Sequence, residues 1–126
     1  WSRSVLRNMI RQKKGRIINV ASTAAEEVYE GNSVYGASKA ALEAFTKSFG
    51  AEVYKYGVTV NAIAPGLINT DMSVVFEGKD PKEPIRHTAL GRKIEPKEIV
   101  DVVLNMLSDD MSIVNGTVVT INGGHK

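Results

Sequence analysis

The stretch Val58-Thr-Val-Asn-Ala-Ile-Ala-Pro-Gly66 decides the fold of this chain. Residues 58–64 form a short, mostly apolar run rich in β-branched side chains, and Pro65-Gly66 ends it. Near-continuous runs of this kind are typical of strands that are covered on both faces in a parallel sheet. We therefore predict a buried strand over residues 58–64.

Upstream of this strand the chain alternates between helix and strand signals. Leu42, Phe45, Phe49 and Val53 recur at helical spacing and predict the inward stripe of a long helix from about Val34 to Tyr56. Gly57 is expected to stop that helix.

Before the long helix, residues 16–21 predict a short buried strand, which a loop at residues 22–33 follows. The chain opens with a helical pattern that reaches about Lys13. Gly15 is expected at the left-handed position after this first helix.

Downstream, residues 67–94 are irregular in pattern, and we predict a substrate-binding loop region there, since long irregular segments in compact domains are usually functional. Pro96 opens a last helix, and residues 117–121 predict a final strand. The alternation as a whole predicts an α/β fold with a doubly wound parallel sheet and helices on both faces.

The start of the chain and the number of strands suggest a part of a larger domain. Trp1 is not an initiator methionine, and the helical pattern is already under way at residue 2. Three strands are few for an open parallel sheet, and no glycine-rich strand-to-helix turn of the dinucleotide-binding kind occurs. We expect residues 1–126 to form the C-terminal catalytic half of one domain whose N-terminal cofactor-binding half is absent.

Composition excludes several classes of function. The net charge is only +2 and cysteine is absent, which removes disulfide and thiolate chemistry and argues against a nucleic-acid partner. His87 and His125 stand alone, without metal-ligand spacing, so no metal site is predicted. No apolar run is long enough to span a bilayer and no signal peptide is visible, so we predict a cytoplasmic protein without a membrane partner.

Three polar residues carry the chemistry. Tyr35 and Lys39 are four residues apart and project from one face of the long helix, while Ser22 follows the strand before it. A nearby ammonium favours the phenolate form, which suits general acid/base work on an alcohol or ketone. Taken alone, the pair is an ordinary solvated helix pair and the serine an ordinary cap, but all three converge on the edge where parallel sheets bind ligands.

The same residues belong to motifs that cover nearly the whole chain. Together these motifs resemble the short-chain dehydrogenases/reductases, most closely the 3-oxoacyl-[acyl-carrier-protein] reductase and glucose dehydrogenase-like members. In chain order they are Ile17-Ile-Asn-Val-Ala-Ser22, Tyr35-Gly-Ala-Ser-Lys39-Ala-Ala-Leu42, Val60-Asn-Ala-Ile-Ala-Pro-Gly66, Asn115-Gly116 and Ile121-Asn-Gly-Gly124. The resemblance implies a Rossmann-like fold.

The resemblance also implies roles for single residues. Ser22 would polarise the substrate oxygen, Tyr35 would be the catalytic acid/base, and Lys39 would support Tyr35 and bind the nicotinamide ribose. The segment expected to cradle the nicotinamide of NAD or NADP comprises Pro65, Gly66, Ile68 and Thr70. Further candidates for the substrate pocket are Met72, Val75 and Phe76.

The implied activity is an NAD(P)-dependent oxidoreductase that interconverts a ketone or 3-oxoacyl carbonyl, small or linked to an acyl-carrier protein, and a secondary alcohol. One alternative is a non-catalytic truncated fragment that acts only through self-association, and a lyase or epimerase is a weaker one. A homo-oligomer is also implied. Ala37, Ala40, Ala41 and Ala44 form a small-residue face on the long helix that either packs on the sheet or packs across a subunit interface.

Overall fold

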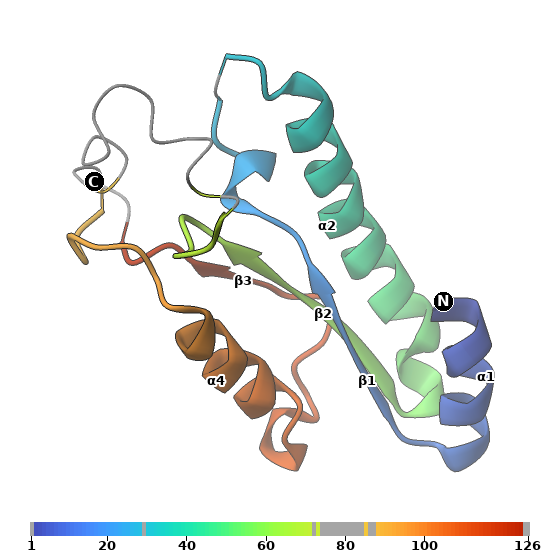
Figure 1. The fold of residues 1–126 in the computed structure, drawn as a ribbon. Coiled ribbons are helices and arrows are strands. Elements are labelled where there is room, and N and C mark those ends of the chain that lie inside the picture. Colours follow the sequence, from blue (N-terminus) through green and yellow to red (C-terminus); the bar gives the residue numbers. More distant parts are fainter. Residues whose placement is uncertain (1, 29, 72, 74–84, 86–87, 125–126) are drawn as a thin grey trace.

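A three-stranded parallel sheet with the order β1-β2-β3 forms the centre of the molecule (Figure 1). The computed structural model describes residues 2–28, 30–71, 73, 85 and 88–124. The strands are β1 (Gly15–Val20), β2 (Val58–Pro65) and β3 (Val118–Ile121). The α-helices are α1 (Ser2–Gln12), α2 (Ser33–Val53) and α4 (Pro96–Met106). Short 3₁₀ turns are η1 (Thr23–Ala25), η2 (Tyr54–Tyr56) and η4 (Asp109–Met111).

The helices cover both sides of the sheet. Figure 1 shows α1 and α2 along one side and α4 on the other. Leu6 of α1 and Phe49 of α2 pack against a buried cluster that includes Val58 and Val60 of β2. The predicted α/β architecture, a parallel sheet wound on both faces, is therefore confirmed.

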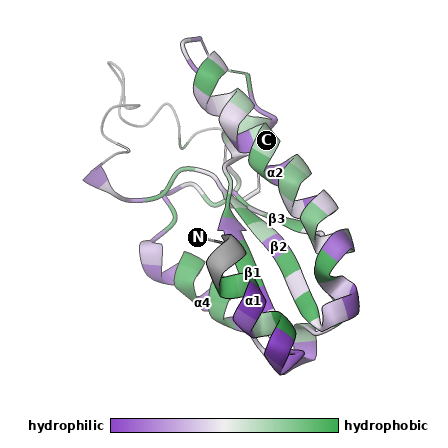
Figure 2. Ribbon diagram, turned by 90° about the vertical axis from the view of Figure 1, so that its right-hand side faces the viewer, coloured by the Kyte–Doolittle hydropathy of each residue, from purple (hydrophilic) through white to green (hydrophobic). Residues whose placement is uncertain are grey.

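The middle strand carries the core. All eight residues of β2 are buried, because β2 pairs with a neighbour on each edge and helices lie over both faces. Figure 2 shows hydrophobic colouring along much of β2 where the helices cover it. The strand predicted at residues 58–64 is confirmed, with Pro65 as its last residue.

The junction between α1 and β1 differs from the expected helix end. Lys13, not Gly15, takes the left-handed conformation, with φ at 52°, while Gly15 is the first residue of β1. A Cβ atom on Gly15 would lie 2.6 Å from the sulfur of Met9. Gly15 therefore serves the close approach of helix to strand, and the prediction of a left-handed Gly15 is wrong.

The inward face of α2 also differs from the predicted stripe. Phe45 is 45% exposed, whereas the buried residues of α2 are Glu43, Thr46, Gly50 and Val53. A Cβ atom on Gly50 would lie 3.2 Å from the carbonyl oxygen of Val60, so the helix approaches the sheet too closely for a row of large side chains. Polar and small residues therefore face the sheet, and Phe45 instead stacks on Phe49 with ring centroids 5.0 Å apart.

The helix ends themselves follow the sequence signals. Gly57 follows η2 with φ at 75°, a left-handed conformation that stops α2 as predicted. Pro96 opens α4, where the carboxylate of Glu98 accepts a hydrogen bond from the backbone N–H of Glu95 at 2.9 Å. In segment 67–94 the structure describes residues 67–71, 73, 85 and 88–94, and a parallel bridge joins Ile68 to Ile94.

Candidate active site

The carboxyl ends of β1 and β2 lie at one edge of the sheet, here called the carboxyl edge. The backbone N–H of Ala21 donates to the carbonyl of Ile63 at 2.8 Å, which extends the parallel pairing to the last residue before Ser22. Pro65 ends β2 at the same edge. Ligands of open parallel sheets bind outside such edges, since the loops that follow the strands converge there.

Ser22 is both a helix cap and a candidate site residue. It is the N-cap of η1, and its Oγ accepts a hydrogen bond from the backbone N–H of Ala24 at 3.2 Å. A hydroxyl that accepts a bond keeps its own O–H as a donor. The capping contact therefore orients Ser22 and leaves its proton free to be offered to a substrate oxygen.

A glycine brings the start of α2 against the loop after Ser22. A Cβ atom on Gly36 would lie 2.7 Å from the carbonyl oxygen of Ala24, a distance that side chains do not tolerate. Because Gly36 lacks that atom, the first turn of α2 packs onto η1. Tyr35, the residue before Gly36, is thereby placed beside the loop that begins at Ser22.

Lys39 links the end of β1 to Tyr35. Its Nζ donates to the carbonyl oxygen of Val20 at 2.9 Å and lies 5.5 Å from the centroid of the Tyr35 ring. An ammonium above a phenol ring is electrostatically favourable. Tyr35 is 45% exposed, so its hydroxyl is accessible to a ligand at this edge while the cation stays close to it.

The predicted nicotinamide segment leaves the same edge. Gly66 continues the sheet pairing by donating its N–H to Ile121 at 2.8 Å. Ile68 forms the bridge with Ile94, and the backbone N–H of Thr70 donates to Ile68 at 2.9 Å. Thr70 is exposed, so its side chain is open to a ligand.

A hydrogen-bond relay that the sequence patterns did not indicate holds Thr70 in place. Lys93 Nζ donates to the Oγ of Ser73 at 2.9 Å, and that Oγ donates to the carbonyl oxygen of Thr70 at 2.7 Å. Ser73 is 95% buried, with an exposed fraction of 5%. Ser73 lies only three residues after Thr70, a spacing typical of a side-chain turn, but nothing local pointed to Lys93.

A buried carboxyl on α2 was also missed. Burial, followed by the nearby carboxylate of Glu26, raises the pKa of Glu43, and Lys47 acts in the opposite direction. Glu43 is one helical turn after Lys39 on α2. The surface between η1 and α2 therefore carries a carboxyl, that of Glu43, whose pKa is raised.

Some predicted residues cannot be placed. Met72, Val75, Phe76, His87 and His125 lie outside the described residues. Among the residues that are described, no group of three or more His, Cys, Asp or Glu side chains has a geometry that could hold a metal ion. None of the described helices combines the length and the apolar character that crossing a bilayer requires.

Comparison with protein families and relatives identifies what this arrangement is similar to. The family model described as Enoyl-(Acyl carrier protein) reductase matches residues 1–126. The chain is 37% identical over 123 residues to a 3-oxoacyl-[acyl-carrier-protein] reductase of Vibrio cholerae, covering 98% of this chain and 50% of the relative. It is 39% identical to the enzyme of the same name from Pseudomonas aeruginosa, with the same coverage. The chain thus spans about half the length of the curated relatives it matches.

Solved structures agree with these sequence relatives. A 3-oxoacyl-[acyl-carrier protein] reductase from Brucella melitensis superposes with a TM-score of 0.87 at 33% identity, over 98% of this chain and 47% of that one. An acetoin dehydrogenase from Enterobacter cloacae superposes with a TM-score of 0.83 at 31% identity, over 98% and 48%. With a family model matched from end to end and structural relatives of the same fold, this chain belongs to the short-chain dehydrogenase/reductase family.

Proposed function

We propose that the protein carrying this chain is an NAD(P)-dependent oxidoreductase that interconverts a carbonyl and a secondary alcohol, with Tyr35 as the acid/base. The observation that carries the proposal is the position of Lys39, whose ammonium is held by Val20 at the end of β1 and lies over the Tyr35 ring. A cation in this position stabilises negative charge on the phenol oxygen, which is the state that takes a proton from an alcohol.

The donors at the carboxyl edge fit a nicotinamide cofactor. An ammonium has three N–H donors, and the carbonyl of Val20 accepts one from Lys39, which leaves two for ribose hydroxyls. Thr70 presents an exposed side chain from the segment after Pro65-Gly66. We propose Lys39, Thr70 and the backbone from Pro65 to Ile68 as the residues that would hold the nicotinamide end of NAD or NADP.

The chain's own residues perform the proton chemistry. When bound, the cofactor supplies or accepts the hydride. In the reducing direction the O–H of Ser22 donates to the carbonyl oxygen of the substrate and orients it. Tyr35 then gives its phenolic proton to that oxygen as negative charge develops there, and Lys39 stabilises the phenolate that remains.

The substrate class is proposed from the relatives. Both curated relatives reduce, by name, a 3-oxoacyl group on an acyl-carrier protein, and the second structural relative is named for acetoin. We propose a ketone or 3-oxoacyl carbonyl, either small or linked to an acyl-carrier protein. The choice between NAD and NADP and the cytoplasmic location stay predictions.

Self-association is the second proposal, and the exposed faces of two helices favour it. Ala37, Ala40, Ala41 and Ala44 are all exposed in this chain, which contradicts packing of that face on the sheet. Val100 and Leu104 of α4 are 53% and 60% exposed. Exposed apolar helix faces of this kind can mark interaction sites, so we propose a homo-oligomer.

The oxidoreductase proposal is tested by kinetics with NADH and NADPH on β-ketoacyl thioesters and small ketones. We expect cofactor oxidation that depends on the ketone and that Tyr35→Phe abolishes. Turnover that persists in Tyr35→Phe at the wild-type rate would overturn the assignment of Tyr35. Sedimentation of the same preparation gives the oligomeric state, and a monomer would overturn the second proposal.

A further inference from the structure

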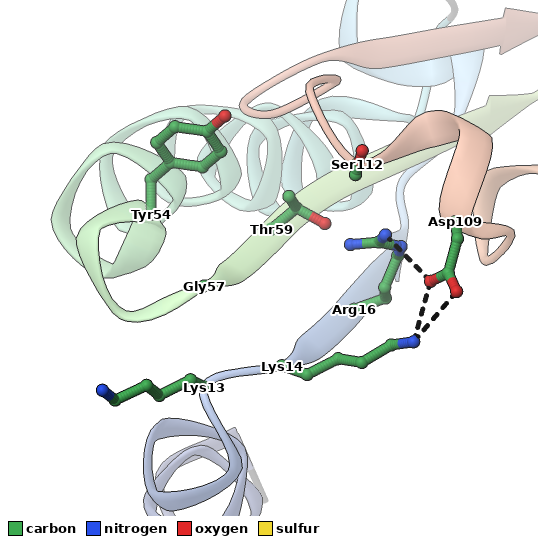
Figure 3. A pocket seen from close by; sticks show the side chains of 8 residues that line it. All are labelled: Lys13, Lys14, Arg16, Tyr54, Gly57, Thr59, Asp109 and Ser112. Atoms are coloured by element: carbon green, nitrogen blue, oxygen red, sulfur yellow. Dashed lines mark hydrogen bonds and ion pairs between the residues drawn. The ribbon is translucent and has the colours of Figure 1, made fainter.

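A second candidate binding site, lined by different side chains, lies at the opposite end of the sheet, at the amino ends of β1 and β2. An open pocket of about 470 Å³ is found there (Figure 3). Its volume falls in the range of about 300–1,000 Å³ that small-molecule sites occupy. The polar residues that line it and matter here are Lys13, Lys14, Arg16, Thr59, Asp109 and Ser112.

The lining is rich in hydrogen-bond donors and poor in acceptors. The lining residues include three cations, Lys13, Lys14 and Arg16, and one carboxylate, so the pocket has an excess of two positive charges. Asp109 pairs with Lys14 at 2.9 Å and with Arg16 at 3.5 Å, and Figure 3 shows both cations converging on it. The two basic side chains therefore already bind one carboxylate, that of Asp109, in the wall of the pocket.

Donors remain after those contacts are made. The side chain of Arg16 is only 11% exposed, and its Nε donates to the carbonyl of Ser108 at 3.1 Å. A guanidinium has five N–H donors in a rigid fork, so the contacts to Ser108 and Asp109 do not use them all. Lys13 is an exposed residue at the rim of the pocket with a left-handed backbone, and in Figure 3 its side chain extends away from Arg16.

A buried hydroxyl is the second and independent observation. Thr59 is 98% buried, with an exposed fraction of 2%, and its Oγ1 has no hydrogen-bond partner among the described residues. In Figure 3 that oxygen points to the side of the pocket where Arg16 lies. Buried hydroxyls normally form hydrogen bonds. A buried hydroxyl without one, next to a guanidinium that still has unused N–H donors, is the pattern expected of a site that binds a hydrogen-bond acceptor.

From this geometry we infer that the pocket binds a small oxyanion of the phosphate or carboxylate class, with Arg16 and Thr59 as its donors and Lys13 as a cation at the rim. An anionic oxygen that enters beside Arg16 accepts from the guanidinium and from the Thr59 hydroxyl together. Planar or forked oxyanions match the guanidinium in this way. The site is independent of the proposed oxidoreductase function, because it uses none of the residues at the carboxyl edge.

The test is calorimetric titration of the protein at low ionic strength with two probes, pyrophosphate and citrate, against sodium chloride as a control. The result expected is saturable binding of at least one probe at one site per chain. Binding of pyrophosphate alone assigns the phosphate class, and binding of citrate alone assigns the carboxylate class. Absence of saturable binding by both probes overturns the proposal.

Two variants with opposite effects make the test specific. Asp109→Asn removes the competing carboxylate, so the probe should bind about two- to fivefold more tightly. Lys13→Met should weaken binding by a similar factor. Lys55→Met is the matched control, since Lys55 has the same charge, lies over the ring of Tyr56 and does not line the pocket. Equal losses in Lys13→Met and Lys55→Met would show a non-specific charge effect and contradict the site.

Thr59→Val tests the effect of this hydroxyl on anion binding separately from its effect on stability. Valine keeps the shape of threonine and removes an unpaired buried hydroxyl, so the variant should unfold at a temperature no lower than the wild type. The same change deletes a donor to an anion, so binding of the probe should weaken about tenfold. Unchanged probe affinity in a folded Thr59→Val protein contradicts the role of this hydroxyl.

Discussion

The two ends of the sheet show how differently one set of parallel strands can present polar groups. At the carboxyl edge the side chains proposed to be functional already have partners in the chain, as Ser22 has with Ala24 and Lys39 with Val20. At the amino ends, the Thr59 hydroxyl is buried with no partner among the described residues, and the cations outnumber the carboxylate. One end is pre-organised by internal contacts, whereas the other has more hydrogen-bond donors than acceptors.

The two ends differ in the contacts that position their side chains. At the carboxyl edge, backbone pairing and the close approach at Gly36 set the positions, and few side-chain contacts are needed. At the amino end, side-chain ion pairs made by Asp109 hold the walls, and these pairs are exposed to solvent and salt. We therefore expect changes at the carboxyl edge to alter rate and changes at the amino end to alter stability and ion binding.

The largest expected effect is on catalysis at the carboxyl edge. Tyr35→Phe removes the proposed acid/base, and losses from deleting such a group are typically about 10²- to 10⁴-fold in turnover. Because Tyr35 is 45% exposed, the thermal unfolding temperature should hardly change. Steady-state kinetics and a melting curve on the same preparation check both expectations, and a large drop in melting temperature would remove the distinction between the two ends.

The next effect is on stability near the amino end. Gly57→Ala places a side chain at φ +75°, where the new Cβ atom would also collide with the backbone carbonyl of Lys13. We expect the free energy of unfolding to fall by about 2 kcal/mol or more, since strained left-handed backbone alone costs about 1–3 kcal/mol. Urea denaturation measures this loss.

Gly91→Ala is the matched control for that change. Gly91 has φ at +68°, and no atom of the described residues lies within 4 Å of the position of a new Cβ. It should therefore lose only the conformational part, and the difference between the two variants isolates the collision with Lys13. Equal losses in the two variants would show that the contact at Lys13 relaxes without cost.

A smaller effect is expected from the relay behind Thr70. Lys93→Met removes the donor to Ser73, which fixes the carbonyl of Thr70 in the proposed cofactor segment. Loss of one hydrogen bond of this kind should raise KM for NAD(P)H by about five- to tenfold with kcat little changed. Lys93→Arg should restore most of it, because arginine keeps the charge and the donor.

Lys97→Met provides the control for Lys93→Met. Lys97 is an exposed lysine on α4 that pairs with Asp101 at 2.7 Å, away from the relay. It should leave KM unchanged. A KM for the cofactor that is the same in Lys93→Met as in Lys97→Met would show that the relay has no part in holding Thr70.

The smallest effect is a pH dependence shared by both ends. The hydrogen bond from Arg92, with help from the backbone N–H of Glu95, lowers the pKa of Glu98 from 4.5 to about 2. The hydrogen bond and charge of Lys14, followed by the charge of Arg16, lower the pKa of Asp109. Carboxyls with lowered pKa values add stability that is fully present above their ordinary pKa and is lost as the pH falls.

For Glu98 that loss should run from about pH 4.5 down to about 2. Both carboxylates are exposed, so we expect only a shallow slope. Glu98→Gln and Asp109→Asn should each lower the melting temperature slightly at pH 7 and leave it nearly unchanged in acid, which flattens its decline as the pH falls. A variant that keeps the full acid slope would show that its ion pair does not contribute.

Much of the fold followed from local patterns. The buried run at residues 58–64, the stop at Gly57 and the start at Pro96 each depend on near neighbours in the chain, and each appears as predicted. The stripe of α2 failed at Phe45, because how closely a helix approaches a sheet depends on the strand it meets. Gly15 failed for a similar reason, since Met9 packs against it.

Some features of the candidate site could likewise be predicted from the sequence, and others could not. Ser22, Tyr35 and Lys39 were found from spacing and motif, because residues that follow parallel strands meet at one edge whatever the details of packing. The relay from Lys93 to Ser73 joins residues 20 apart, and no local pattern encodes such a contact. The position of Lys39 against Val20 was likewise visible only once strand and helix were packed.

The sequence by itself determined the order of elements, the family and the residues proposed for chemistry, because these depend on periodicity and on motifs of a few residues. The tertiary structure alone decided which atoms approach one another, as at Gly36 and Ala24, and which groups remain unpaired, as at Thr59. Burial and pairing are properties of contacts between distant segments. Thr59 is therefore a candidate binding group only because the fold buries its hydroxyl with no hydrogen-bond partner among the described residues.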